Sequence, residues 1–301
     1  MTRSIDLQGH RGARGRFPEN TLFGFAGALA IGVDTLELDV AMTADGVVVV
    51  THDATLNPDI TRTSDGAWLA ERGPAISALR LAELSNYDVG RIRPGSAYAA
   101  LYPGQVPHDG ARIPTLTEVL QIDPAVRFNI ELKTFPSGNR GSATDGAGLA
   151  EAVVAVADAA GVSDRITVQS FDWRGPRRLR HTRPEIRLAW LTRSAILHDA
   201  RAWWDGPAPA DHAGSVPRAV AAEGGPVWAP EHPDLTKESV AEAHGLGLLV
   251  VPWTVNRAED MRRLLSWGVD GLISDLPDVA RIVMDDAGLR LPPRRIVATA
   301  G

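Results

Sequence analysis

The residues best suited to chemistry in this chain lie where apolar strand patterns end. Two histidines, His10 and His52, each follow such a pattern, and Arg11 comes directly after the first. A neutral and a protonated imidazole can serve as base and acid at neutral pH, and the planar guanidinium of arginine fits phosphate oxygens. This combination is suited to the cleavage of a phosphodiester.

Three carboxylates are predicted to face inward from two strands. In segment 35–41 apolar residues alternate with Glu37 and Asp39, and in segment 128–133 they alternate with Glu131. Because successive strand residues point to opposite faces, the apolar sets can pack against helices while the carboxylates face the other way. The alternative is a pair of edge strands whose polar faces meet solvent. The same inversion in two separate strands favours an inner acidic cluster.

An inner acidic cluster requires a positive partner, because a buried carboxylate is costly unless a cation neutralises it. The chain has no cysteine, which excludes thiolate metal sites and favours an oxygen-bound cation. We predict one divalent cation, Mg²⁺ or Ca²⁺, with Mn²⁺ as a further candidate. Lys133 follows Glu131 on the same face and offers its charge either to a phosphate or to a neighbouring carboxylate.

Trp253 is the aromatic candidate for substrate contact. It ends the apolar run at 250–253 and shares the inward face of Val251. It therefore either belongs to the core or forms a wall against which a polyol or choline packs. Just beyond it, Asn256 and Glu259 have the spacing of a capping box, which predicts that Asn256 is a helix N-cap.

Short apolar strand patterns alternate with helical patterns along the chain. Strands are predicted near 5–10, 35–41, 47–51, 127–133, 166–170, 187–191, 226–229, 248–253 and 271–274. The helical stretches between them include one that stops at Gly32 and one, from 147 to 160, that stops at Gly161. The alternation implies an α/β fold with parallel strands and outer helices. About eight strands in a chain of 301 residues favour a closed (β/α)8 TIM barrel.

Residues 54–112 interrupt the alternation. They are rich in Gly and Pro and contain no strong strand, which predicts a small inserted subdomain or a capping loop over the site. We predict a single domain over residues 1–290 that includes this insertion, followed by a peripheral tail at 291–301. The large apolar and aromatic residues of the insertion could form its own core or an exposed rim: Trp68, Tyr87, Tyr98, Leu101 and Tyr102.

Composition limits the class of protein. The chain is 44% hydrophobic and 23% charged with a formal net charge of −6, an ordinary globular balance that gives no support for nucleic-acid binding. No apolar run reaches the roughly 18 residues of a transmembrane segment. The chain as given has no signal-peptide pattern, which favours a cytoplasmic location. The oligomeric state stays open.

The order of these motifs resembles the glycerophosphodiester phosphodiesterase family. The likeness is most specific in GHRGARGRFPENT followed by DTLELDVAMTADGVVVVTHDATL, and FNIELKTFP, VQSFD, VVPWTVN and GVDGLISDLPDVA extend it over residues 10–279. The resemblance implies a (β/α)8 barrel with a small insertion after the second histidine. It also implies these site roles: His10 and His52 as acid–base pair, Glu37, Asp39 and Glu131 as metal ligands, Arg11 and Lys133 at the phosphate, and Trp253 facing glycerol.

The implied reaction is metal-dependent hydrolysis of a small glycerophosphodiester, such as glycerophosphocholine or glycerophosphoethanolamine, to glycerol 3-phosphate and an alcohol. Which histidine is the acid, which is the base, and whether a cyclic phosphate forms stay open. The alternative is a lysophospholipase D or sphingomyelinase D-like phosphodiesterase on the same barrel, which we expect to expose an apolar rim. A non-catalytic binding protein has no need of two histidines with three carboxylates. A sugar-processing barrel leaves the histidines unexplained.

Overall fold

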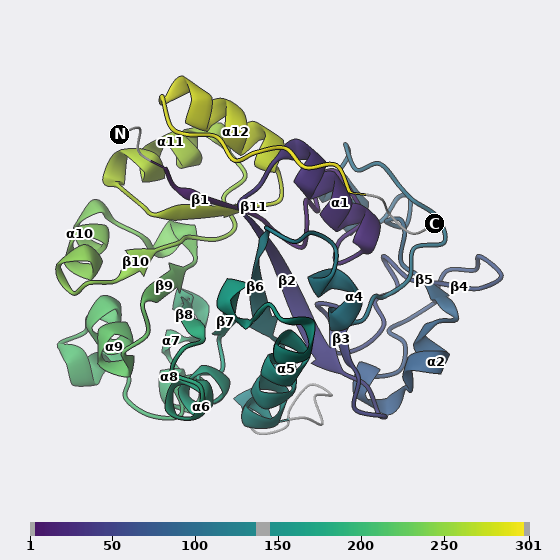
Figure 1. Ribbon diagram of the computed structural model, residues 1–301, viewed down its shortest axis with the longest axis horizontal. Coiled ribbons are helices and arrows are strands. Elements are labelled where there is room, and N and C mark those ends of the chain that lie inside the picture. Colours follow the sequence, from purple (N-terminus) through teal and green to yellow (C-terminus); the bar gives the residue numbers. More distant parts are fainter. Residues whose placement is uncertain (1–3, 137–144, 298–301) are drawn as a thin grey trace.

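Eight parallel strands form a nearly closed barrel surrounded by helices (Figure 1). The computed structural model describes residues 4–136 and 145–297. The strands follow one another around the barrel in the order β10 (Leu249–Val250), β9 (Val227–Pro230), β8 (Arg187–Thr192), β7 (Ile166–Ser170), β6 (Arg127–Leu132), β2 (Thr35–Met42), β1 (Asp6–Gly9) and β11 (Gly271–Ser274). Hydrogen bonds from Ile273 N to Pro252 O, at 3.0 Å, and from Asp270 N to Val250 O, at 2.9 Å, join β11 to the β10 segment. The predicted TIM barrel is confirmed.

The outer helices begin and end at local signals. α1 (Leu22–Ile31) is capped by Thr21, whose side chain accepts from Gly24 N, and ends at Gly32 with φ 99°. α5 (Gly146–Ala160) ends at the left-handed Gly161. The remaining outer helices are α4 (Leu116–Leu120), α6 (Arg174–Thr182), α7 (Ser194–Leu197), α8 (Ala200–Trp204), α9 (Val216–Glu223), α10 (Lys237–Gly245), α11 (Ala258–Trp267) and α12 (Pro277–Asp286). No helix in the described ranges is both long and apolar enough to cross a membrane.

One predicted strand does not belong to the barrel. β3 (Val48–Val50) pairs with β2 in the antiparallel direction. Only residues 43–47 separate the two strands, and a parallel pair requires a crossover of about a dozen residues or more. β2 and β3 therefore form a hairpin, and this hairpin returns the chain to the mouth of the barrel at His52.

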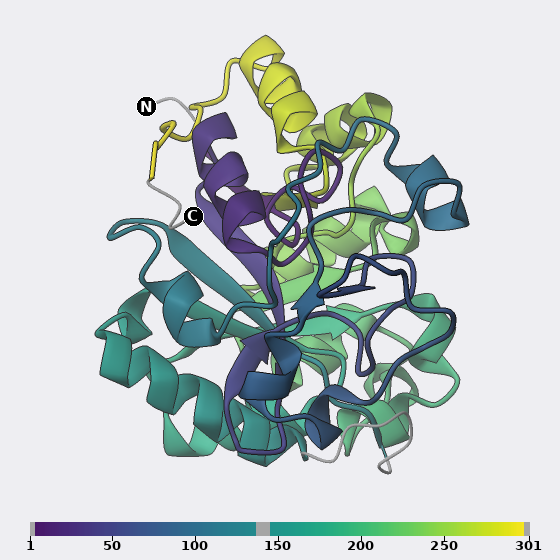
Figure 2. The same cartoon turned by 90° about the vertical axis from the view of Figure 1, so that its right-hand side faces the viewer.

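The insertion packs on β3 through an apolar cluster separate from the main core. It contains β4 (Arg62–Thr63), β5 (Tyr87–Asp88), α2 (Leu81–Leu84) and α3 (Ala97–Leu101). Its cluster consists of Val49, Leu56, Ile76, Leu84, Val89 and Ile113. Figure 1 shows β4, β5 and α2 together at one side of the barrel, and in Figure 2, which faces that side, the insertion lies in front of the strands.

The two faces of each barrel strand divide as the alternation predicts. Leu36, Leu38, Phe128, Ile130 and Val168 are buried in the main core between strands and helices. The barrel interior is apolar on one half, with Ala189, Leu191, Val227, Ala229, Val251 and Ile273. It is polar on the β1, β2 and β6 half, with Gln8, Glu37, Asp39, Asn129 and Glu131, all buried. The polar half is where chemistry can be placed.

The C-terminal segment lies along α1 at the opposite end of the barrel from the insertion. Arg295 N donates to Leu29 O at 2.8 Å, and its guanidinium donates to Val33 O at 3.0 Å. Leu291 and Val297 pack against the main core. The division into a domain at 1–290 and a tail at 291–301 stays a prediction.

Candidate active site

A cavity of about 210 Å³ at the carboxyl ends of the strands brings the predicted site residues together. Seven of the eight line it directly: His10, Arg11, Glu37, His52, Glu131, Lys133 and Trp253. The eighth, Asp39, is fully buried, with Oδ1 3.0 Å from the Lys133 ammonium. The carboxyl end of a parallel barrel is where the active sites of this architecture are built.

The acidic cluster could hold a metal ion. One carboxylate oxygen each from Glu37, Asp39 and Glu131 lies within 4.8 Å of the others. Burial, with Asp39 and Glu131 beside it, raises the pKa of Glu37 well above its usual range. Burial also raises the pKa of Glu131, against the opposing charge of Lys133. Three oxygen ligands whose mutual repulsion a cation would relieve fit a hard divalent ion.

Arg11 reaches this cluster through a constrained turn. Its φ of 51° lies in the left-handed region, and so does the φ of 89° at Gly12, where a Cβ atom would lie 2.9 Å from the Gly24 carbonyl carbon. The turn directs Arg11 N to Glu37 Oε2 at 3.0 Å, and the guanidinium donates to Glu19 Oε1 at 2.8 Å. The guanidinium is therefore oriented before any ligand binds.

Asp39 is held from two further sides. Asn20, also left-handed with φ 54°, donates through Nδ2 to Asp39 Oδ2 at 2.9 Å. Although burial acts in the opposite direction, Lys133 and Arg11 hold the pKa of Asp39 well below its usual range. Asp39 is thus the member of the cluster whose carboxylate form the neighbouring cations stabilise.

His10 is oriented by a carboxylate that directly follows the last strand of the barrel. Its Nδ1 lies 2.6 Å from Asp275 Oδ1, and its Nε2 lies 3.9 Å from Glu37 Oε2. Burial lowers the pKa of His10 to about 4, although Asp275 opposes the shift. At neutral pH the ring is therefore neutral, with Nε2 toward the acidic cluster.

Within the described ranges, the Asp275 carboxylate has four side-chain partners. Besides His10, it accepts from Arg14 Nε at 2.9 Å, from Asn256 Nδ2 at 2.7 Å and from the Tyr102 hydroxyl at 3.3 Å. The interpretation of Asn256 as a helix N-cap is wrong, because the N-cap of α11 is Arg257. The Asn256 side chain is used to hold Asp275 instead.

His52 has a matching aspartate of its own. Its Nδ1 lies 2.9 Å from Asp53 Oδ1, and Asn57 Nδ2 donates to Asp53 Oδ2 at 2.7 Å. The His52 side chain keeps 33% of its surface exposed. Burial and then the nearby charges of Arg11 and Lys133 lower its pKa to about 4. Both rings thus carry an aspartate at Nδ1 and leave Nε2 for a ligand.

Two tyrosines of the insertion, Tyr98 on α3 and Tyr102 directly after it, contact the partners of the reactive residues. The Tyr98 hydroxyl donates to Glu19, the partner of Arg11, and the Tyr102 hydroxyl donates to Asp275. They therefore form neither a core of the insertion nor an apolar rim. Leu101, between them on the helix, points outward with 67% of its surface exposed.

Trp253 stands on the apolar half of the barrel. Its ring meets Phe171 edge to face, with centroids 5.3 Å apart, and its Nε1 donates to Ala229 O at 3.0 Å. Both rings line the cavity together with Leu191 and Ile273. The cavity thus has one charged wall and one apolar wall.

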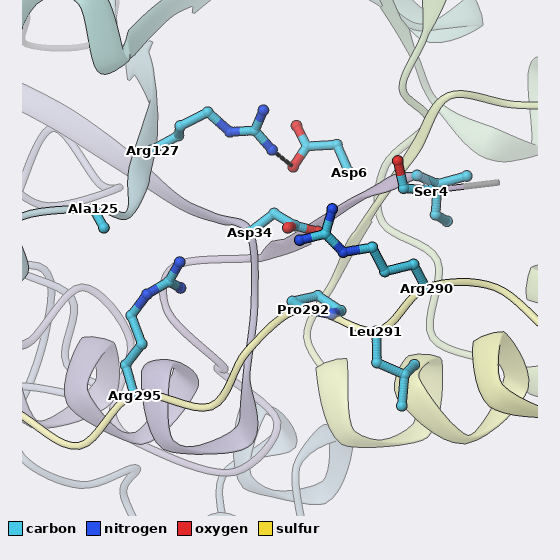
Figure 3. A pocket seen from close by; sticks show the side chains of 10 residues that line it. Ser4, Asp6, Asp34, Ala125, Arg127, Arg290, Leu291, Pro292 and Arg295 are labelled. Carbon is cyan, nitrogen blue, oxygen red and sulfur yellow. Dashed lines mark hydrogen bonds and ion pairs between the residues drawn. The ribbon is translucent and has the colours of Figure 1, made fainter. Parts of the chain in front are cut away.

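A larger cavity, of about 430 Å³, lies at the other end of the barrel. Figure 3 shows it between Arg127, which donates to Asp6, and Arg290 and Arg295 of the C-terminal segment. It contains neither a histidine nor a cluster of carboxylates among its lining residues. The chemistry of the lining, and not the volume, identifies the smaller cavity as the candidate active site.

Sequence reasoning missed several residues of this site, among them Arg14, Glu19, Asn20, Tyr98, Tyr102, Phe171, Arg193 and Asp275. Asp275 carried a usable signal, because it directly follows an apolar strand, as His10 does. The tyrosines carried none, since they lie inside the insertion.

A model of the glycerophosphoryl diester phosphodiesterase family matches residues 10–279. The chain belongs to this family. A glycerophosphodiester phosphodiesterase of Bacillus altitudinis is 30% identical over 280 residues, which cover 90% of this chain and 94% of that protein. The crystal structure of a Silicibacter pomeroyi protein assigned to the same activity is 38% identical, with a TM-score of 0.86 and 95% of each chain covered.

A phosphodiesterase of Oleispira antarctica, solved with its product sn-glycerol-3-phosphate, shares the fold at 23% identity, with a TM-score of 0.69 and 94% and 97% of the two chains covered. Membership of this family makes the protein a phosphoric diester hydrolase, and the resemblance drawn from its motifs is confirmed.

Proposed function

We propose that the enzyme hydrolyses water-soluble glycerophosphodiesters, such as glycerophosphocholine and glycerophosphoethanolamine, to glycerol 3-phosphate and an alcohol. One divalent cation, Mg²⁺ or Ca²⁺ with Mn²⁺ as a further candidate, belongs to the active enzyme. The observation that carries the proposal is that His10 and His52 line one cavity with a buried acidic cluster, Arg11 and Lys133. The product bound by the Oleispira antarctica relative supports glycerol 3-phosphate as the product here.

The charged wall of the cavity binds the phosphate. Glu37, Asp39 and Glu131 would hold the cation, whose chemistry is to neutralise and polarise the phosphoryl oxygens. Arg11 and Lys133 donate hydrogen bonds to the same group. Their ion pairs with the cluster orient these donors in advance, so little reorganisation is needed when charge develops on the phosphate.

The two histidines move the protons. One Nε2 takes the proton of the attacking hydroxyl or water as the new P–O bond forms. The other ring must enter this step as imidazolium, protonated from solvent when the anionic diester is bound, and it gives its Nε2 proton to the leaving oxygen as the old P–O bond breaks. Asp275 and Asp53 hold the opposite nitrogens. Trp253 and Phe171 offer an apolar surface for the carbon chain of glycerol.

The test of this function is a comparison of soluble and lipid substrates. We expect release of glycerol 3-phosphate from glycerophosphocholine and glycerophosphoethanolamine, and little release of choline from lysophosphatidylcholine vesicles, since Tyr98 and Tyr102 turn their hydroxyls into the site. Turnover of the vesicles alone would favour the lysophospholipase D or sphingomyelinase D-like alternative. Binding of the soluble diesters without turnover would indicate a non-catalytic binding protein.

Asp275→Asn is expected to lower kcat by about 10²-fold, because an amide can donate to His10 Nδ1 and so place the ring proton on Nε2. KM should change little, but the thermal unfolding midpoint should fall, because the amide no longer neutralises the buried Arg14 guanidinium. The matched control is Asp270→Asn, which alters the Asp270–His244 pair, at 2.9 Å, outside the cavity. Equal kcat in the two variants would refute the positioning role of Asp275.

A further inference from the structure

Arg193 reaches the active-site cavity from the side opposite to the reactive residues. It follows β8 with an extended backbone, φ −153° and ψ 145°, in the register of the inward residues Ala189 and Leu191. Between β8 and β1 lie β7, β6 and β2 on one side, and β9, β10 and β11 on the other. Arg193 and His10 therefore approach the same cavity from across the barrel mouth.

Among the described residues, the positive charge of Arg193 has no carboxylate partner. The other basic residues of the cavity, Arg11, Arg14 and Lys133, each form an ion pair at 2.7 to 2.9 Å. Across residues 4–136 and 145–297, no carboxylate oxygen lies within 4.0 Å of a guanidinium nitrogen of Arg193, which is the limit for an ion pair. Its buried Nε also lacks a hydrogen-bond partner in these ranges. An unpaired buried donor is costly, so the position favours a bound acceptor.

The carboxylates on the far side of Arg193 are already engaged. Arg193 borders a second cavity, of about 350 Å³, that Asp234 and Glu242 also line. Asp234 accepts from Ser194 N at 2.6 Å, and Glu242 accepts from Arg218 at 2.8 Å. A ligand that extends past the apolar wall thus meets an uncompensated guanidinium with open space behind it.

We propose that Arg193 binds a second anionic group of the substrate, so that the enzyme prefers glycerophosphodiesters with a negative charge besides that of the reacting phosphate. The inference rests on the proposed function. Carboxylate or phosphate oxygens would accept hydrogen bonds from the guanidinium fork. The reacting phosphate stays with Arg11 and Lys133 on the charged wall.

Two matched pairs of substrates test the preference and separate its sources. Glycerophosphoserine differs from glycerophosphoethanolamine by one carboxylate, and bis(glycerophospho)glycerol differs from glycerophosphoglycerol by one glycerophosphate unit. We expect the wild-type enzyme to favour the anionic member of at least one pair by about tenfold or more in kcat/KM. Arg193→Gln should bring that ratio close to one, mainly through KM, because the contact is remote from the reacting atoms. Arg193→Lys should keep part of the preference.

Arg201→Gln is the control for charge, because Arg201 is exposed on α8, where it pairs with Asp211. It should leave both ratios unchanged. If the wild-type kcat/KM values for the two members of each pair were nearly equal, the inference would be overturned. It would also be overturned if Arg193→Gln lowered kcat/KM equally for both members of a pair. Wild-type turnover of glycerophosphoethanolamine separates these outcomes from failure of the proposed function, in which no diester of either pair is hydrolysed.

Discussion

His10→Ala is expected to lower kcat for glycerophosphocholine by about 10² to 10⁴-fold, the usual scale of general acid–base catalysis. Among the imidazoles of the described residues, only that of His10 lies within 4.0 Å of a carboxylate of the acidic cluster, with Nε2 3.9 Å from Glu37 Oε2. His52→Ala should produce a loss of similar size if the two rings divide the two proton transfers. Steady-state release of glycerol 3-phosphate measures both variants.

The control for these variants is His244→Ala. His244 also pairs with an aspartate, Asp270, but lies on α10 and outside the cavity lining. It should therefore retain wild-type kcat. A His10→Ala enzyme with near-normal turnover would rule out His10 as a catalytic group. Nearly equal losses in His244→Ala would point to a general effect on folding.

Removal of divalent cations by chelation is expected to abolish turnover, and one of Mg²⁺, Ca²⁺ or Mn²⁺ should restore it. Glu37, Asp39 and Glu131 lie within 4.8 Å of one another, and burial raises the pKa of Glu37 and of Glu131. A cation bound to the native state should also raise the free energy of unfolding, by about 2.7 kcal/mol at about 100 times its Kd. Thermal unfolding with and without each cation measures this stabilisation independently of activity.

Glu37→Gln tests the same site by mutation. It should lose both the restored activity and the cation-dependent rise in the unfolding midpoint, because one of three charged ligands is gone. The control is Glu151→Gln, which removes an exposed carboxylate paired with Arg178 on the outer helices. Full activity after exhaustive chelation would contradict the metal requirement, as would a cation response in Glu37→Gln equal to that of the wild type.

Much of the site was predictable because its residues sit at the ends of strands. The alternation of apolar and polar residues around Glu37, Asp39 and Glu131 is a local signal, and strand geometry alone turns it into an inner acidic face. His10 and His52 were found by the same rule. Asp275 obeys the rule as well, so its omission was a failure to apply the pattern to the last strand.

Other features of the structure could not be predicted from short sequence patterns. Asn256 shares its capping-box spacing with many true N-caps, yet the chain starts α11 later and uses the amide to hold Asp275. From the sequence, Tyr98 and Tyr102 were equally compatible with the core of the insertion and with an exposed rim. No pattern in the insertion indicates which side of its helix faces the barrel. The antiparallel direction of β3 follows from the short connection at 43–47, a length that decides the pairing only once both strands are known.

The sequence by itself determined the fold class, the inward carboxylates, the histidines and the family, because each depends on periodicity or on contiguous motifs. The tertiary structure alone decided the partners that are distant in the sequence. Asp275 lies 265 residues from His10 along the chain, and Tyr98 lies 79 residues from Glu19. Such contacts form only when the barrel closes from β11 to β1 and the insertion folds back over the mouth, and no local pattern records either event. The unpaired charge of Arg193 could likewise be recognised only from the structure, in which the other basic residues of the cavity each pair with a carboxylate.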